Sequence, residues 1–341
     1  MLLSDSTTLR LGGPAAAFVA ATTDTQLLEA LTAAERPILL LAGGSNLVVA
    51  DEGFPGTVVQ VATRGIERDG DALHVAAGEP WDALVAHTVG EGLAGIEALS
   101  GIPGSVGATP IQNVGAYGQE VSDTIMSVRA FDRTTAETVD LAPEDCGFTY
   151  RSSAFKRDPE RYAVLRVSFA LHASRSSRPI RYAELARALG VEVGETAPLL
   201  AVREAVLQLR RSKGMVLDAN DPDTTSAGSF FTNPILDATA FAALRERAGE
   251  NVPGFPEPDG RVKTSAAWLI DHAGFTKGYG NPAGIAISTK HVLALTNRGA
   301  GTTAELVALA QEIARGVEAT FGVALHPEPV FVGHAWDPIA A

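Results

Sequence analysis

The sequence predicts an α+β protein whose first half carries two separate glycine-rich turns. The first turn, GGSN at residues 43–46, interrupts the apolar run PILLLAGGSNLVV, which predicts one strand on either side of a break. The second, GIPGSVGATPIQNVGAYG at residues 101–118, is rich in glycine and has no charged side chain. Such clusters mark tight turns or places where a ligand approaches the main chain closely.

Capping signals and short apolar runs predict the remaining elements of the first half. Thr23 and Gln26 form a capping-box pattern ahead of three leucines, which predicts a helix over residues 24–35. The runs TVVQVA and ALHVAAG predict short strands. Pro80 is expected to open a helix that carries Trp81.

The chemistry of the two turns favours a phosphate-bearing ligand. The GGSN turn offers exposed N–H groups and two small polar side chains, which is the chemistry that binds pyrophosphate. Neither turn reads GxGxxG or GxxxxGK[ST], so a doubly wound dinucleotide-binding domain is not supported. Apolar residues interleave the second turn, which indicates a buried loop rather than a mobile linker: Ile102, Val106, Ile111 and Val114.

The chain beyond the basic segment QLRRSKG, residues 208–214, is expected to form a further domain. The polar stretch DPDTTS, residues 221–226, is a plausible junction. After it we expect a helix over 238–248, a strand pair around GIAISTKHVLALTN, and a long helix over 302–321 with a capping box and one apolar face. The sequence contains no internal repeat and no low-complexity segment.

Composition excludes several classes of protein. The chain has 341 residues, 46% of them hydrophobic, which is enough for two or three domains. A net charge of −13 argues against nonspecific nucleic-acid binding. Cys146 is the only cysteine, so an internal disulfide and a cysteine-based metal cluster are excluded. The sequence has no apolar stretch of signal-peptide or membrane-spanning length, and we expect a cytoplasmic monomer without a metal or a membrane partner.

Seven segments occur in an order that resembles the UDP-N-acetylenolpyruvoylglucosamine reductase family: LAGGSNLVV, SGIPGSVGATPIQNVGAYGQE, FTYRSSAFK, RRSKG, AGSFFTNP, VKTSAAWLIDHAGFTKG and HPEPVFVG. The resemblance spans nearly the whole chain. It implies a vanillyl-alcohol-oxidase-type (PCMH-type) FAD-binding fold in two subdomains, followed by a C-terminal α+β substrate-binding domain. The first FAD subdomain would comprise residues 1–65 with the tail 326–341, the second 66–215, and the substrate-binding domain 216–325.

The resemblance implies an NADPH-dependent reduction through noncovalent FAD. The substrate would be the enolpyruvyl ether of UDP-N-acetylglucosamine and the product UDP-N-acetylmuramate, a peptidoglycan precursor. Hydride addition to the methylene carbon builds charge on the neighbouring carbon, so the site must stabilise an enolate-like dianion and supply a proton. The residues expected to line the flavin and its pyrophosphate are Gly43, Gly44, Ser45, Asn46, Gly101, Pro103, Gly104, Ser105, Gly107, Asn113, Gly115 and Tyr117.

Three residues match the family's catalytic positions. Arg151, in FTYRSSAFK, matches the arginine whose planar fork suits the enolate carboxylate. Glu328, in HPEPVFVG, matches an acid that is either protonated beside the anionic intermediate or orients Arg151. Ser229, in AGSFFTNP, matches the proton donor.

Further residues match positions that contact the substrate. Lys213 and Asn233 are both expected to contact the substrate, Lys213 on the uridine diphosphate. Tyr182 resembles the mobile tyrosine that covers the diphosphate in the longer subclass of the family, and the inserted stretch 175–207 has the length for it. Tyr117 is expected near the flavin, with packing in the core as an equal alternative.

Two positions depart from the family pattern, and two other functions stay open. Thr232 stands where many relatives have lysine, and Arg298 where an acidic residue can occur. A flavin oxidase of the same fold, acting on an alcohol or sugar, would need no cationic pocket for an enolate carboxylate. A nucleotide-sugar binding protein without turnover would lack Arg151, Ser229 or Glu328, and all three are present.

Overall fold

The computed structural model describes residues 1–34 and 37–336, which form two compact units. The first, called the terminal unit below, combines residues 1–14, 45–54 and the chain from residue 213 onward. The second, called the central unit, combines residues 15–44 and 55–212. The three-domain division expected from the sequence stays a prediction. Residues 35–36 and 337–341, which it included, lie outside the described residues.

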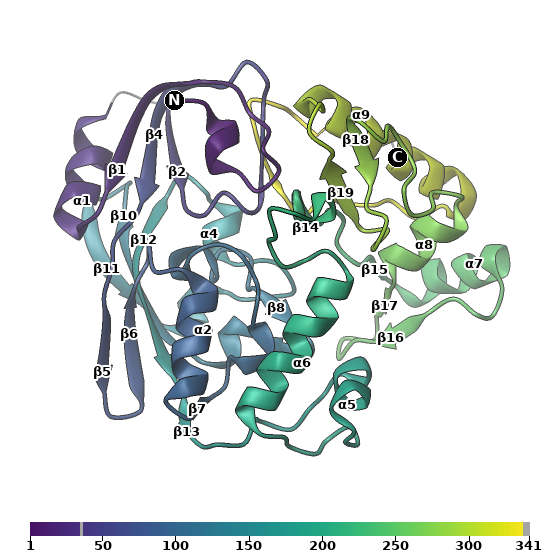
Figure 1. Ribbon diagram of the computed structural model, residues 1–341, viewed down its shortest axis with the longest axis horizontal. Helices are drawn as coiled ribbons and strands as arrows, with labels where there is room; N and C mark the ends of the chain where they lie inside the picture. Colours follow the sequence, from purple (N-terminus) through teal and green to yellow (C-terminus); the bar gives the residue numbers. More distant parts are fainter. Residues whose placement is uncertain (35–36, 337–341) are drawn as a thin grey trace. The chain divides into compact units, whose positions relative to one another are not determined.

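Two sheets form the frame of the central unit (Figure 1). The three-stranded sheet has the order β1-β4-β2, with bounds Ala15–Ala21, Phe54–Val61 and Ile38–Leu41. The five-stranded sheet has the order β11-β10-β12-β6-β5, with bounds Glu137–Leu141, Ile125–Asp132, Tyr162–Ala170, Ala72–Ala76 and Ile66–Asp69. Two short antiparallel pairs complete it: β13 (His172–Ala173) with β7 (Leu93–Ala94), and β8 (Gly115–Ala116) with β9 (Gln119–Glu120).

The helices of the central unit begin where the sequence offers a cap or a proline. In α1 (Asp24–Ala33), the Thr23 side chain accepts a hydrogen bond from the Gln26 N–H, as the capping pattern predicts. The other helices are α2 (Trp81–Gly90), α3 (Pro143–Cys146), α4 (Ala154–Arg157), α5 (Ala183–Leu189) and α6 (Leu199–Ser212). A bidentate ion pair joins α6 to α2, because Arg203 donates to both carboxylate oxygens of Asp82 at 2.6 and 2.9 Å.

The core of the central unit lies between the five-stranded sheet and α2. Trp81 is fully buried there, and its indole N–H donates to the carbonyl of Leu99 at 3.0 Å. Residues of β6, β10 and β12 supply much of the remaining apolar surface. The 101–118 segment is anchored on this core through Val106, which is also fully buried.

The terminal unit is built around α9 (Thr303–Phe321). Two three-stranded antiparallel sheets belong to it: β14-β19-β18 (Ser226–Ser229, Ala294–Asn297, Ile285–Ile287) and β15-β17-β16 (Ile235–Leu236, Val262–Thr264, Gly254–Pro256). A parallel pair joins β20 (Val330–Val332) to β3 (Leu47–Val49), and α7 (Ala238–Ala248) and α8 (Ala266–His272) pack against α9. Figure 1 shows α9 beside β18 in this unit, and the two elements are in contact.

Short 3-10 helices occur at five places in the described chain: Leu3–Ser6, Glu97–Leu99, Val106–Ala108, Val121–Asp123 and Pro222–Thr224. The elements predicted from the sequence are confirmed, including the strand break at GGSN, the helix over 238–248 and the strand pair of β18 and β19. The first helix ends at Ala33, and the residue at which it was expected to end, Glu35, lies outside the described residues.

The capping box of α9 provides a direct test of this description. The Thr302 hydroxyl accepts from the Glu305 N–H at 3.1 Å, and the Glu305 carboxylate accepts from the Thr302 N–H at 2.9 Å. We predict that Thr302→Ala lowers the free energy of unfolding by about 1 kcal/mol, because the Glu305 N–H loses the hydroxyl that accepts its hydrogen bond. Urea unfolding followed by circular dichroism measures it. Thr320→Ala, near the end of the same helix, is the control and should have little effect, because its hydroxyl bonds only the Gly316 carbonyl.

Candidate functional site

The two glycine-rich turns meet in the central unit. A Cβ atom added to Gly43 would lie 2.7 Å from the Cα of Gly104, so no side chain fits at that point. The same holds at Gly107, where a Cβ would lie 2.5 Å from the Cβ of Ala77. Two stretches about sixty residues apart in the sequence therefore place their main chains in contact. No side chain separates the two turns where they meet, and glycine permits this close packing.

A buried hydroxyl lies next to this contact between the two turns. Ser105 is 6% exposed, and among the described residues its Oγ has no hydrogen-bond partner. Its neighbours are held by main-chain hydrogen bonds, from the Trp81 N–H to the Gly104 carbonyl and from the Val106 N–H to the Glu79 carbonyl. A buried hydroxyl normally has a partner, so this one fits a bound molecule with a polar group. The bare backbone and the hydroxyl together fit the pyrophosphate-bearing flavin that the sequence predicts.

The GGSN turn is divided between the units. Gly43 and Gly44 belong to the central unit, whereas Ser45 and Asn46 begin the segment of the terminal unit that continues into β3. In the terminal unit, the Asn46 carbonyl accepts from the Val330 N–H at 2.9 Å, and the Asn46 amide lies 3.4 Å from the carbonyl of Glu328. The parallel pairing of β3 with β20 thus brings Asn46 and Glu328 to the same end of the two strands.

The structure brings Ser229 and Glu328 together. Ser229 is the last residue of β14, where the pairing with β19 is irregular between Ser226 and Ser229. Gly228 lies within this irregularity with φ 74, a conformation that glycine adopts without strain. Immediately beyond, the carbonyl of Phe230 accepts from the Glu328 N–H at 2.8 Å. Both side chains are half-buried, so they remain accessible to a ligand of the terminal unit.

Arg151 lies in the central unit at the tip of a tight turn. Reciprocal main-chain hydrogen bonds between Thr149 and Ser152 close the turn. The guanidinium of Arg151 reaches back to the second glycine-rich segment, where it donates to the carbonyls of Asn113 at 3.2 Å and Gly115 at 2.5 Å. The predicted catalytic arginine is therefore bound to the loop that is predicted to line the cofactor.

The two tyrosines single out the same region. Tyr117 and Tyr182 pack edge to face, with ring centroids 5.5 Å apart. Burial raises the pKa of Tyr117 to about 12, so its hydroxyl stays protonated at neutral pH and can donate a hydrogen bond. Tyr182, directly before α5, is 45% exposed. Both alternatives weighed for Tyr117 have support, since it lies on the glycine-rich segment and also packs against the apolar cluster around α5 and α6.

The remaining predicted residues lie in the terminal unit. The Oδ1 of Asn233 accepts from the N–H of Ala266, the first residue of α8, which fixes the amide at the start of that helix. Lys213 follows α6 directly and is the first residue of the last segment of the terminal unit. Thr232 departs from the family pattern. Its N–H donates to the His326 carbonyl at 3.0 Å.

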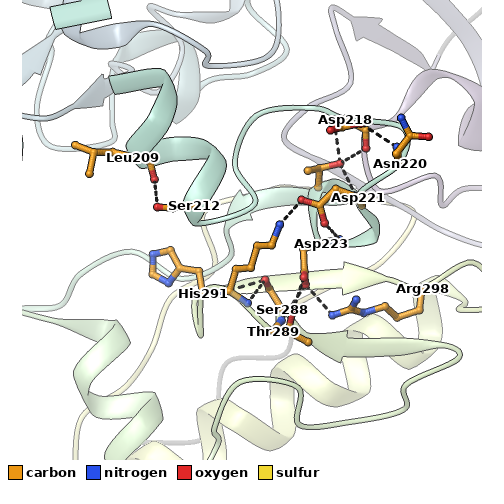
Figure 2. Close-up of polar contacts among 12 residues, drawn as sticks. Leu209, Ser212, Asp218, Asn220, Asp221, Asp223, Ser288, Thr289, His291 and Arg298 are labelled. Atoms are coloured by element: carbon orange, nitrogen blue, oxygen red, sulfur yellow. Dashed lines mark hydrogen bonds and ion pairs between the residues drawn. The ribbon is translucent and has the colours of Figure 1, made fainter. Parts of the chain in front are cut away.

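Arg298, the second departure, forms part of a buried polar network (Figure 2). It donates to Asp223 at 2.7 Å, and the two side chains are 12% and 5% exposed. Asp223 also accepts from the N–H of Thr289 at 2.9 Å and from its hydroxyl at 2.6 Å. Burial acts to raise the pKa of Asp223, but these hydrogen bonds, one from Ser288 and the Arg298 charge lower it below its ordinary value of 3.8. The Lys290 ammonium group donates to the carboxylate of the neighbouring Asp221.

Sequence reasoning missed the buried polar groups that hold these segments in place. Asp223 was expected in a simple polar junction, and a run such as DPDTTS contains no sign of burial. Glu97 is fully buried and accepts from the Gly95 N–H, the Gln119 amide and the Arg178 N–H. Its position as a lone charge in the apolar run LAGIEALSGI was a usable signal. No group of three metal-binding side chains occurs in residues 1–34 and 37–336, and no helix there is long and apolar enough to cross a bilayer.

Comparisons with known proteins agree on one family. A model of an FAD-binding domain matches residues 15–142, and a model of the C-terminal domain of UDP-N-acetylenolpyruvoylglucosamine reductase matches residues 221–332. The protein of that name from Streptomyces coelicolor is 60% identical and is covered over 89% of its length by 98% of this chain. The one from Thermobifida fusca is 57% identical, with 97% of this chain and 96% of the relative covered.

A solved structure is similar over the whole length. The crystal structure of the reductase from Thermus caldophilus matches with a TM-score of 0.65 and 26% identity, over 97% of each chain. The FAD-binding model covers most of the strands of the central unit, and the reductase model covers most of the terminal unit. The fold class predicted from the sequence is confirmed.

The buried pair of Asp223 and Arg298 predicts a pH-dependent contribution to stability. Because the pKa of Asp223 is lowered in the folded state, the contribution is fully present above the ordinary value of 3.8 and is lost as pH falls through the folded pKa. At pH 7, Asp223→Asn should cost about 3–5 kcal/mol, since it leaves a buried arginine without its counter-charge. The difference between the two proteins should shrink as pH falls below 4, measured by urea unfolding.

Asp259→Asn is the matched control for that experiment. Asp259 pairs with Arg261 at the same distance, 2.7 Å, but the two side chains are 52% and 53% exposed. Solvent screens such a pair, so its loss should leave the unfolding midpoint nearly unchanged at both pH values. Equal effects of the two substitutions would contradict the assignment of Asp223 as a structural anchor.

Proposed function

The chain belongs to the UDP-N-acetylenolpyruvoylglucosamine reductase family, and we propose that Arg151, Ser229 and Glu328 are its catalytic residues. Its function is the NADPH-dependent reduction of the enolpyruvyl ether of UDP-N-acetylglucosamine to UDP-N-acetylmuramate, in peptidoglycan precursor synthesis. The observation that carries the assignment of the three residues is their anchoring. Arg151 is bound to the glycine-rich segment, and Ser229 adjoins the residue whose carbonyl accepts from Glu328.

FAD is the cofactor, and the glycine-rich turns are the residues that would hold it. FAD held there would supply hydride transfer from NADPH to the methylene carbon of the substrate. The main chain around Gly43, Gly104 and Gly107 would lie against the cofactor, because the two glycine-rich turns meet there without intervening side chains. The buried hydroxyl of Ser105 would donate to one of its polar groups. Gly44, Ser45, Asn46, Gly101, Pro103 and Tyr117, with the main chain of Asn113 and Gly115, complete the proposed cofactor set.

Arg151 would stabilise the enolate-like dianion that hydride addition creates. A guanidinium presents five N–H donors in one plane, which allows it to bind main-chain carbonyls on one side and a carboxylate on another. The carbonyls of Asn113 and Gly115 hold this plane in place before the substrate arrives. Donors that are already oriented require no reorganisation as charge develops, which is how they accelerate the chemical step.

Ser229 would supply the proton that completes the product. Hydride adds to the methylene carbon, and the electron pair moves to the neighbouring carbon and its carboxylate. Proton transfer from the Ser229 hydroxyl to that neighbouring carbon then forms the second C–H bond, and the serine regains its proton from solvent. The irregular pairing at the end of β14 sets the direction of Ser229, and Glu328, held at the adjoining Phe230 carbonyl, would assist either the proton transfer or the enolate.

Other proposals concern substrate contacts and location. Lys213 would contact the uridine diphosphate of the substrate, Asn233 would contact the substrate as well, and Tyr182 would close over the diphosphate. The exposed ring of Tyr182, which rests on Tyr117, is suited to move when a ligand binds. We also propose a cytoplasmic, monomeric enzyme. Cys146 is unsuited to thiol chemistry, because burial raises the pKa of its thiol to about 12 and keeps it protonated.

Arg151→Ala tests the enolate role. Turnover with the enolpyruvyl substrate should fall at least about a hundredfold, the order lost with one oxyanion-stabilising donor. Glu328→Ala should show a loss of the same order in steady-state NADPH oxidation. Near-normal turnover of Arg151→Ala would mean that another group holds the substrate carboxylate, and the assignment would fail.

Ser229→Ala separates the two halves of the reaction. Reduction of bound FAD by NADPH needs no proton on the substrate, so stopped-flow bleaching at 450 nm, the flavin band, should stay within about threefold of wild type. Reoxidation by the enolpyruvyl substrate should slow by a factor of about a hundred to ten thousand, the range for general acid catalysis. Ser229→Cys is the companion variant and should retain part of the activity, since a thiol can donate. If both half-reactions slowed equally, Ser229 would be a packing residue.

A further inference from the structure

Strained backbone gathers around Arg151. Five residues other than glycine have positive φ in the described chain, and three of them lie in this region: Asn113 at 45°, Tyr117 at 49° and Arg151 at 53°. Side chains other than glycine rarely adopt this left-handed conformation, and asparagine adopts it more readily than tyrosine or arginine. Strain of this kind persists only where the surrounding contacts enforce it, and it concentrates at functional sites. The contacts that enforce it here can be identified.

Asn113 links the three segments that meet at Arg151. It is 1% exposed, and its amide nitrogen donates to the carboxylate of Glu120 at 2.7 Å and to the carbonyl of Thr149 at 3.2 Å. Its amide oxygen accepts from the Ser122 N–H at 3.2 Å. Thr149 precedes Arg151 by two residues, so Asn113 fixes the turn that carries the arginine. Its own carbonyl accepts from the guanidinium, so it also fixes one end of the side chain.

Gly115 provides the space that the guanidinium occupies. A Cβ atom at this position would lie 2.9 Å from the Nη1 of Arg151, and 3.0 Å from both the Gln119 carbonyl oxygen and the Cγ of Glu120. Gly115 has no positive φ, so alanine could adopt its backbone conformation and only the space would be lost. The carbonyl of the same residue accepts from Nη2 at 2.5 Å. The absence of a side chain and the presence of the carbonyl therefore serve the same guanidinium.

We propose that Asn113 and Gly115 are positioning residues that hold the Arg151 guanidinium in the orientation used for the enolate carboxylate. This inference rests on the proposed catalytic role of Arg151. It assigns the Asn113 side chain to the arginine, whereas the main chain of the same segment remains available to the cofactor. We call this arrangement the cradle. The carbonyls of Asn113 and Gly115, on either side of Val114, accept from the guanidinium, and the Asn113 amide donates to the turn that carries Arg151. The absence of a side chain at position 115 leaves room for the guanidinium.

Gly115→Ala tests the cradle. The added methyl group would displace the guanidinium, so reoxidation of bound FAD by the enolpyruvyl substrate should slow by about ten- to a hundredfold, part of what a misplaced donor costs. Reduction by NADPH, the dissociation constant for FAD and the thermal midpoint should stay close to wild type. Gly90→Ala is the control at the end of α2, where a Cβ would meet nothing within 4 Å. It should match wild type in both half-reactions and in FAD binding, with a thermal midpoint that is equal or higher.

A double-mutant cycle decides whether Gly115 acts through Arg151. If it does, adding Gly115→Ala to Arg151→Ala should slow reoxidation no further, within about twofold. Slowing that multiplies in the double variant would overturn the proposal, as would a Gly115→Ala enzyme with wild-type reoxidation. Normal reoxidation in Arg151→Ala alone would instead overturn the catalytic role of the arginine, so the two failures are distinguishable.

Asn113→Ala repeats the test from the other side of the cradle. It removes the hydrogen bonds of the side chain with Thr149, Glu120 and Ser122 without adding bulk, so it should give the same split between the half-reactions if Gly115→Ala does not fold. A slowing of both half-reactions, or weaker FAD binding with normal reoxidation, would assign Asn113 to the cofactor and contradict its role in positioning Arg151.

Discussion

The close approach of main chain to main chain in the glycine-rich segment is the constraint on which the site depends. At Gly104 the neighbour is another glycine turn, at Gly107 it is β6-adjacent backbone and the Ala77 side chain, and at Gly115 it is the arginine side chain. Side chains at these positions would separate groups that must touch. A segment without charge but with several apolar anchors meets this requirement, because the anchors bury it and the glycines leave its backbone accessible.

The same economy of side chains explains how the terminal unit presents its residues. β3 begins immediately after the GGSN turn, and its parallel pairing with β20 places Asn46 beside the main chain of Glu328. The irregularity at the end of β14 then places Ser229 next to the residue whose carbonyl accepts from Glu328. Deeper in the unit, the buried Asp223 holds the segment before β14 to the strand pair of β18 and β19 through Thr289 and Arg298. The polar anchors therefore position the residues proposed to react.

Much of this was predictable from the sequence, because local signals agree with the fold. Thr23 and Thr302 cap the helices they were expected to cap, and the long helix over 302–321 buries the apolar face that its periodicity predicted. The identities of Arg151, Ser229 and Glu328 came from motif resemblance. Their physical support could not be predicted, since positive φ at Asn113 and Arg151 depends on contacts between distant segments.

Charged residues show where sequence reasoning ends. Arg298 departs from the family pattern, and nothing local indicates that Asp223, seventy-five residues earlier, is its partner. Glu97 could have been noticed as a lone charge among apolar residues, but its three donors come from separate parts of the chain. Burial of a carboxylate is decided by tertiary packing, and a single sequence reports it only when the flanking residues are all apolar.

An anaerobic single-turnover experiment tests the central claim most directly. Purified protein loaded with FAD is first bleached with one equivalent of NADPH, and then mixed with the enolpyruvyl ether of UDP-N-acetylglucosamine in the absence of oxygen. The account predicts that the flavin absorbance returns and that one equivalent of UDP-N-acetylmuramate forms. A flavin that stays bleached with this substrate would contradict the account. If oxygen then restored its colour, and an alcohol or sugar bleached it again, the protein would be an oxidase.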